Sequence, residues 1–191
     1  MKKTITFTLF AIAIGFASFA QDKTSFEKGT NVINAGIGVG DVYWGAGYGS
    51  SGLPVSLNAS YEHGITDKLG IGYIGVGAAF GYASQKYNDY GYGSWKSTGI
   101  LIAARGLYHF AIPSEIGQKL DPYAGIQLGY VAVSTHVTND GGYNGTIGKA
   151  GGVVVGFYAG AHYHFNPHVG VYAELGYTSF SILSLGVAFR F

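Results

Sequence analysis

Five histidines give this chain its first candidate chemistry. His162, His164 and His168 lie close together in the sequence, and His109 and His63 fall near the same expected end of their segments. Alternate residues of a β-strand share a face, so imidazoles spaced in this way can converge on a metal ion. A polar lining at the mouth of a protein interior explains the same spacing more simply. We therefore predict no metal site, and the metal interpretation is kept as an alternative.

Two other motifs suggest enzymes. Gly70, Gly72 and Gly75 match the pattern GxGxxG, but no helical segment follows them to offer its N-terminus to a phosphate. His136 and Asp140 could join a serine in a hydrolytic set built from loops. Neither pattern is specific, so the sequence predicts no cofactor and no catalytic residue.

Opposite charges mark a third place for chemistry. Arg105 and Glu174 each lie near the middle of a segment in which apolar and polar residues alternate, and both have the polar parity. Charges in a narrow interior must be paired, so we predict a hydrogen-bonded ion pair between them. Pairing of each charge with a tyrosine or a water molecule is the alternative. Glu62 and Arg190 are expected to form a second, lower pair.

The first 20 residues indicate export. They begin with two lysines after Met1, continue with a short apolar run and end in the small residues of a cleavage site after Ala20, as signal peptides do. We expect residues 1–20 to be a signal peptide and residues 21–191 to be one domain. An N-terminal membrane anchor is the alternative.

Composition narrows the class of protein. Removing the two lysines leaves nine Lys and Arg against 10 Asp and Glu, so the formal net charge falls from +1 to −1. No basic surface for nucleic acid is therefore expected. The chain has no cysteine, which excludes disulfides, thiolate metal sites and cysteine catalysis.

About eight segments of roughly ten residues alternate apolar side chains with Gly, Ser or single charges, as transmembrane β-strands do. They are residues 30–40, 53–63, 69–83, 98–110, 122–133, 152–165, 168–178 and 183–191. A soluble sheet would carry a dense charged coat on its polar face, and these segments do not. A helical span over residues 69–85 is the alternative, but five glycines oppose it. The pattern predicts an all-β fold, a closed antiparallel eight-stranded transmembrane barrel.

The connections support this topology. Residues 41–52, 84–97 and 134–149 are predicted as long outer loops, and residues 64–68 and 166–167 as short inner turns. Residues 111–121 are long for an inner turn, and residues 178–181 are short for an outer loop. The outer loops carry aromatic residues that could bind a surface ligand or lie at the membrane interface: Tyr43, Trp44, Tyr48, Tyr87, Tyr90, Tyr92, Trp95 and Tyr143.

The mature chain resembles the small eight-stranded outer-membrane barrels, such as the OmpA membrane domain, OmpX and the porin-like β-barrel class. Its last strand resembles the C-terminal signal that the barrel-assembly machinery reads in that family, through Leu183, Leu185, Val187, Phe189 and Phe191. The resemblance implies a location in the bacterial outer membrane, among lipid and lipopolysaccharide. Some such barrels are lipid A deacylases with a serine two residues after a histidine, whereas Thr138 follows His136 at that spacing.

Three functions follow from these patterns. We favour a non-enzymatic barrel that contributes to envelope integrity or surface binding through its Gly/Tyr-rich outer loops. A narrow channel for small solutes is the second interpretation, although eight strands leave an interior that side chains just fill. A lipid A-modifying enzyme is the third. The sequence does not identify a surface ligand.

Overall fold

The computed structural model describes residues 24–40, 55–89, 93–138 and 144–191. The predicted signal peptide, residues 1–20, lies outside these ranges. None of the described residues form a helix long and apolar enough to cross a membrane.

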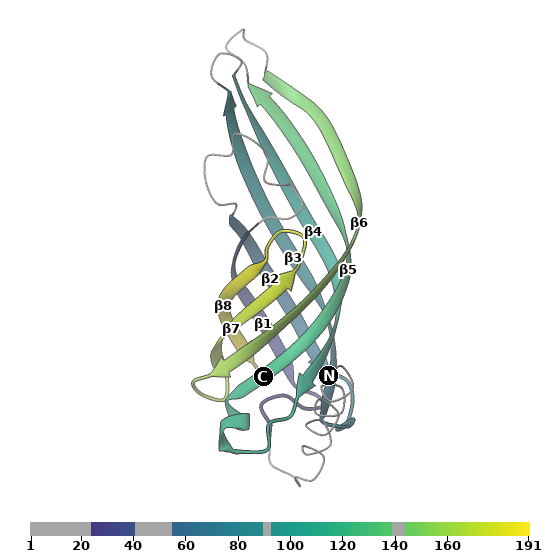
Figure 1. Cartoon of the computed structure of the whole chain (residues 1–191), viewed down its shortest axis with the longest axis vertical. Helices are drawn as coiled ribbons and strands as arrows, with labels where there is room; N and C mark the ends of the chain where they lie inside the picture. The colour runs from purple at the N-terminus through teal and green to yellow at the C-terminus, as the bar shows by residue number, and fades with distance from the viewer. Residues whose placement is uncertain (1–23, 41–54, 90–92, 139–143) are drawn as a thin grey trace, which may run out of the picture.

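Eight antiparallel strands form a closed barrel in which each strand pairs with the next and the eighth returns to the first (Figure 1). The strands are β1 (Asn31–Val39), β2 (Val55–Gly64), β3 (Gly72–Asp89), β4 (Gly93–Phe110), β5 (Leu120–Thr138), β6 (Asn144–His164), β7 (Val169–Tyr177) and β8 (Leu183–Arg190). Pairing of Val32 with Arg190 and of Val39 with Leu183 closes the sheet. The predicted fold class and strand number are confirmed.

Alternation along every strand sorts the side chains into two environments. Exposed apolar side chains cover the outside of the barrel, among them Ile37, Leu57, Phe80, Ile102, Ile126, Leu128, Val155, Phe157, Leu175 and Leu185. Glycines, serines and the buried charges face the inside. An apolar exterior around a closed, polar interior is the arrangement that a bilayer requires, because lipid solvates the apolar side chains and closure leaves no unpaired edge.

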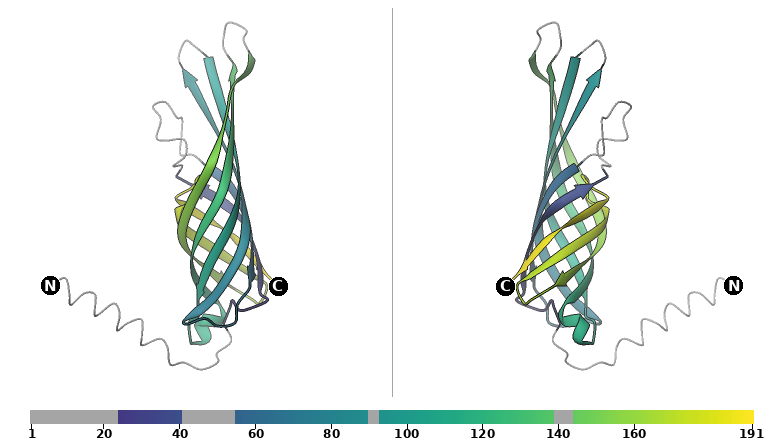
Figure 2. Two further views of the ribbon diagram at one scale, coloured as in Figure 1. Left: turned by 90° about the vertical axis from the view of Figure 1, so that its right-hand side faces the viewer. Right: turned by 90° about the vertical axis from the view of Figure 1, so that its left-hand side faces the viewer.

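The strands differ in length, which the sequence patterns do not predict. β1, β2, β7 and β8 have 8 to 10 residues, whereas β3, β4, β5 and β6 have 18 to 21. About ten tilted residues cross a bilayer, so the four long strands continue beyond the barrel body as a projecting sheet (Figure 2). The predicted loops 84–97 and 134–149 are therefore wrong over most of their length. Their turn-forming residues pair as ladders, such as Ser84 with Thr98 and Ser134 with Lys149.

Two segments outside the strands place a phenylalanine side chain inside the barrel. Between β7 and β8, Phe180 is 1% exposed and packs against Ala83, Leu101, Ala103, Val131 and Val133. Before β1, Phe26 is equally buried and packs near Val32 and Tyr172. The long connection from β4 to β5 contains a short 3₁₀-helix, η1 (Glu115–Gln118), which lies below the barrel body in Figure 1.

Candidate functional site

An arginine at the centre of the barrel organises the interior. Arg105 Nη2 lies 2.5 Å from Glu174 Oε1, and its Nε donates a hydrogen bond to the Tyr158 hydroxyl at 2.5 Å. The guanidinium carbon also lies 4.2 Å from the centre of the Tyr158 ring. Tyr123 donates a hydrogen bond to Glu174 Oε1 at 2.9 Å. The structure thus brings together the predicted pair, and tyrosines surround it as in the alternative.

Two glycines create the space for these contacts. Glu174 pairs across the ladder with Gly160, which pairs in turn with Tyr123. A Cβ on Gly160 would lie 2.8 Å from the Tyr123 ring and 2.9 Å from Glu174 Cγ. In the same way Gly77 separates Glu62 from Arg105 in the ladders of β2, β3 and β4. Without side chains at these two positions, Glu174 reaches Tyr123 and Glu62 reaches Arg105 across one intervening strand.

The predicted pair of Glu62 and Arg190 is not formed. Glu62 is fully buried, and its Oε1 lies 3.6 Å from Arg105 Nη1, so it joins the central cluster. Arg190 lies at the mouth of the barrel and donates hydrogen bonds to the carbonyl oxygens of Pro167 and Ser25. Glu62 and Arg190 both pair with Val32, whose buried side chain lies between them, whereas the residue between Glu62 and Arg105 is Gly77, which has no side chain.

Below the arginine lies a second buried cluster. Asp121 Oδ2 is 2.9 Å from His109 Nδ1 and 3.0 Å from His162 Nδ1. His162 Nε2 lies 3.1 Å from Asn34 Oδ1. The Phe26 ring stacks on His109 with a centroid separation of 3.5 Å and closes the cluster from below. The sequence patterns did not identify Asp121 or Phe26, because one starts a strand and the other precedes the first strand.

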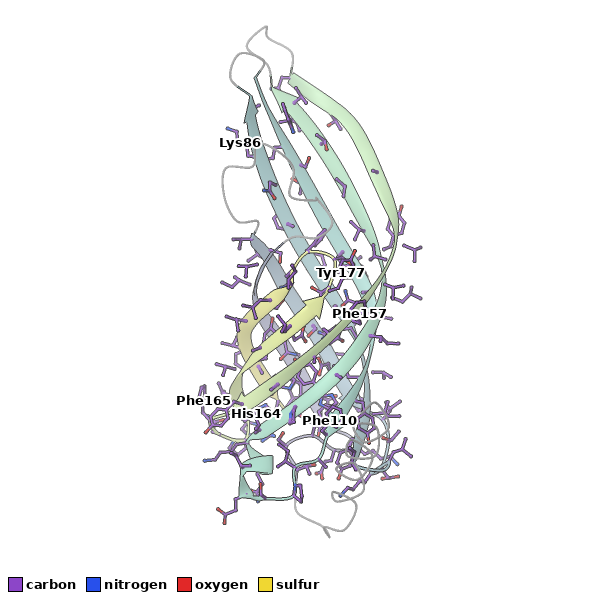
Figure 3. The ribbon with its side chains drawn as sticks, in the orientation of Figure 1. Lys86, Phe110, Phe157, His164, Phe165 and Tyr177 are labelled. Atoms are coloured by element: carbon purple, nitrogen blue, oxygen red, sulfur yellow. The ribbon has the colours of Figure 1, made fainter. Side chains whose placement is uncertain are left out.

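The remaining histidines of the predicted group lie elsewhere. His63 Nδ1 contacts Asn31, and His168 Nδ1 contacts the carbonyl of Arg190. His164 is buried at the end of β6 (Figure 3), and neither of its ring nitrogens has a hydrogen-bond partner in the described part of the chain. His136, from the hydrolytic alternative, is exposed and contacts Asn144 at 2.5 Å. Asp140 lies outside the described residues.

The middle of the lumen leaves little free volume between the described residues. A cavity of about 30 Å³ lies beside the central cluster, lined by residues that include Ser60, Arg105, Gln127, Glu174 and Ser184. Such a volume holds about two water molecules. Phe180 lies above it, and the His–Asp cluster and Phe26 lie below it.

The kind of side chain on the outside of the barrel changes along its length. Aromatic residues gather at the end where the short turns lie, including Phe110 and Phe165, which Figure 3 labels near that end. The edge-to-face pairs Tyr108–Phe110 and Tyr163–Phe165, with centroid separations of 5.2 and 5.6 Å, form part of this girdle. Such girdles lie at a membrane–water interface. The girdle therefore marks the level of one interface.

Basic residues occupy the outward face of the projecting sheet. Lys86 pairs with Lys96, Lys96 pairs with His136, and Lys149 pairs with Ser134 on the next ladder. All three lysines are exposed, and Figure 3 labels Lys86 well above the barrel body. We call Lys86, Lys96, His136 and Lys149 the basic row. The sequence contains one indication of this row: each lysine lies an even number of residues from the outward apolar residues of its strand, and so shares their face.

The predicted loop aromatics are only partly described. Tyr43, Trp44, Tyr48, Tyr90, Tyr92 and Tyr143 lie outside the described residues. Tyr87 and Trp95 belong to β3 and β4 and pair with each other across the ladder, so they are strand residues and not loop residues. Of the predicted assembly signal, Leu185, Val187, Phe189 and Phe191 are exposed and Leu183 is half-buried. Its reading by the assembly machinery stays a prediction.

This closed barrel with an apolar exterior is an outer-membrane β-barrel protein. A family model described as "Outer membrane protein beta-barrel domain" matches residues 7–191, so the chain belongs to that family and is a protein of the bacterial outer membrane. Comparison with curated proteins yields no match.

Solved structures share the fold at low sequence identity. Ail, the attachment invasion locus protein of Yersinia pestis, solved with the heparin analogue sucrose octasulfate, is 15% identical with a TM-score of 0.55; the match covers 86% of this chain and 99% of Ail. The N-terminal β-barrel domain of Pseudomonas aeruginosa OprF is 19% identical with a TM-score of 0.50, over 86% of this chain and 98% of that domain. A de novo designed transmembrane β-barrel is 14% identical with a TM-score of 0.51, over 87% and 98%. At these identities the likeness establishes the fold alone.

Proposed function

We propose that this protein is a closed, non-enzymatic barrel that strengthens the outer leaflet of the envelope by binding lipopolysaccharide along the basic row, and that displays the projecting sheet and its loops at the cell surface. The observation that carries the proposal is the position of the row. Three lysines and a histidine face outward, directly above the apolar band of the barrel.

The position of the row relative to the apolar band is the same on three strands. Lys86 follows Tyr82 by four residues, Lys96 precedes Ile100 by four, and Lys149 precedes Val153 by four. Four residues of strand span about 13 Å, or about 10 Å along the barrel axis at a tilt of about 40°. That height is just outside the hydrocarbon layer, where the phosphates of lipopolysaccharide lie.

Charge also favours an anionic ligand. Lys86 and Lys96 lie directly opposite each other in the ladder, and like charges in that position destabilise a sheet. Residues 84–86, 94–98, 134–136 and 146–151 contain no aspartate or glutamate. A phosphate between the two ammonium groups would relieve their repulsion through charge-assisted hydrogen bonds. The row therefore matches a phosphorylated lipid surface.

The interior supports a structural role over a channel. Arg105, Glu62, Glu174 and the tyrosines occupy the middle of the lumen, and Phe26 and Phe180 lie at its two ends. Eight strands leave room for little more than such side chains. Neither a conducting path nor a nucleophile beside His136 is favoured by the described residues.

The test is binding of purified lipopolysaccharide to the refolded barrel. Replacing Lys86, Lys96 and Lys149 with Gln should weaken binding about 100-fold, because each lysine near an anionic surface contributes about 1 kcal/mol. The matched control replaces Lys28, Lys68 and Lys119 with Gln; these three lysines belong to the part of the chain nearest the opposite mouth. The control should retain the affinity of the wild type. Equal losses in both triple variants, or no binding by the wild type, would contradict the proposal.

A further inference from the structure

We propose that His109, Asp121 and His162 form a binding site for one divalent transition-metal ion of the zinc class inside the barrel. The three residues come from β4, β5 and β6 and are fully buried. One donor atom from each lies within 4.8 Å of the other two. This site is independent of the basic row and lies on the inner side of the sheet.

Two of the three separations between donor atoms lie close to those of tetrahedral zinc. Ligands with bonds of about 2.0–2.1 Å to a tetrahedral metal lie about 3.3 Å apart. Asp121 Oδ2 lies 2.9 Å from His109 Nδ1 and 3.0 Å from His162 Nδ1. The two separations from Asp121 would lengthen by a few tenths of an ångström, and the two ring nitrogens, which lie within 4.8 Å of each other, would adjust around the ion. Two imidazoles and a carboxylate are donors that zinc accepts.

The outer ring nitrogens supply a stronger argument. A histidine that binds a metal through one nitrogen almost always donates its other N–H to a carboxylate or carbonyl oxygen. His162 Nε2 faces Asn34 Oδ1 at 3.1 Å, and His109 Nε2 faces Glu62 Oε2 at 3.7 Å. Each imidazole thus has an acceptor behind it and the Asp121 carboxylate in front of it. A neutral imidazole can donate from one nitrogen only, so this arrangement is completed either by a second proton on each ring or by a cation between the rings and Asp121.

Among the described residues, two of the atoms concerned have no hydrogen-bond partner. Glu62 Oε2 and His109 Nε2 are buried and make no hydrogen bond. Buried polar atoms without partners are rare and costly. A metal that draws the His109 ring and fixes its Nε2–H toward Glu62 would satisfy both atoms.

The charges of the interior also match a dication. Glu62, Asp121 and Glu174 are buried carboxylates, and Arg105 is the permanently charged cation beside them. Three negative charges against one positive charge leave a deficit of two in a medium where unpaired charge is expensive. One divalent ion balances the cluster. Second protons on both histidines would balance it equally, and this metal-free state is the competing outcome.

Access to the site runs past Phe26. Its ring stacks on His109 and closes the cluster toward the mouth of the barrel. The segment before β1 must therefore move before a metal can reach the folded barrel, whereas a refolding chain can take up the ion directly. We expect slow uptake by the folded protein and faster uptake by Phe26→Ala.

The experiment is to refold the mature chain with Zn²⁺ in detergent, remove free metal and measure bound zinc per chain. We expect about one ion in the wild type, and at least about 10-fold less in Asp121→Asn and in His109→Gln, because loss of a direct ligand exceeds the effect of losing an outer partner. His63→Gln is the matched control, since His63 lies near the same mouth but outside the cluster, and it should retain the metal. Heat-dependent gel migration reports that each variant is folded.

A second measurement guards against variants that fail to fold. X-ray absorption of the zinc-loaded wild type should show a four-coordinate ion with two imidazole nitrogens. Absence of zinc from folded wild type, full retention by Asp121→Asn, or a coordination shell without imidazole would each overturn the proposal, and the first result would assign the charge balance to protonated histidines.

Discussion

At the scale of single residues, Glu174 is the interior charge whose removal should cost most. It accepts contacts from both Arg105 and Tyr123 and is nearly fully buried. Glu174→Ala leaves the guanidinium with Glu62, at 3.6 Å, as its carboxylate partner among the described residues. We expect the free energy of unfolding to fall by about 3–5 kcal/mol, measured by urea unfolding in lipid vesicles.

The control for that experiment is Glu115→Ala, because Glu115 is exposed in η1. Exchanging the two charges, Arg105→Glu with Glu174→Arg, should recover little stability, since the carboxylate introduced at position 105 would face the carboxylate of Glu62. A loss below about 1 kcal/mol in Glu174→Ala, the range of a surface pair, would show that the central pair contributes little.

At the scale of elements, the projecting sheet should be separable from the barrel body. The ladder between β2 and β3 ends at Ala83, and the ladder between β6 and β7 begins at Phe157. Joining Ser84 to Thr98 by a short Gly-Ser turn therefore removes, of the described residues, only those of β3 and β4 beyond the closed barrel. We expect the truncated chain to fold and to keep its heat-dependent gel migration.

Truncation of the β5–β6 hairpin between Ser134 and Lys149 provides a second variant of the same kind. Both truncations retain the barrel ladders, so both should resist unfolding nearly as well as the full chain. If either variant lost the gel shift, the projecting sheet would be needed for the barrel to form. The first truncation also removes Lys86 and Lys96, so it should weaken lipopolysaccharide binding while leaving the fold intact.

At the scale of the whole molecule, the features that the sequence predicts are those marked by the alternation of apolar and polar residues. Alternation with a period of two identified eight strands and placed Arg105 and Glu174 inside, because parity alone decides which face a residue occupies. Parity does not say which inward residues meet. Val32 separates Glu62 from Arg190, and only Gly77 separates Glu62 from Arg105, so the predicted partner of Glu62 was wrong. Phe26 and Phe180 stand outside the alternating segments, and no periodic signal marks their burial.

The lengths of β3, β4, β5 and β6 could not be predicted from local sequence patterns either. Residues 84–97 and 134–149 are rich in Gly, Ser, Thr and Asn, which locally favour turns. In the structure their backbones are paired by continuing the ladders of the barrel below. Pairing with an existing strand outweighs a weak local preference.

The most direct test of the membrane-spanning barrel is a depth profile along the outward face of β4. The chain contains no cysteine, so single nitroxide labels can be attached at Lys96→Cys, Ile100→Cys and Ala104→Cys in lipid bilayers, with the inward Ala103→Cys as control. Oxygen should reach the labels at 100 and 104 more readily than a water-soluble nickel chelate, the order should reverse at 96, and both reagents should be excluded at 103. Ready access of the nickel chelate to position 104 would show that this face meets water, and would contradict the account.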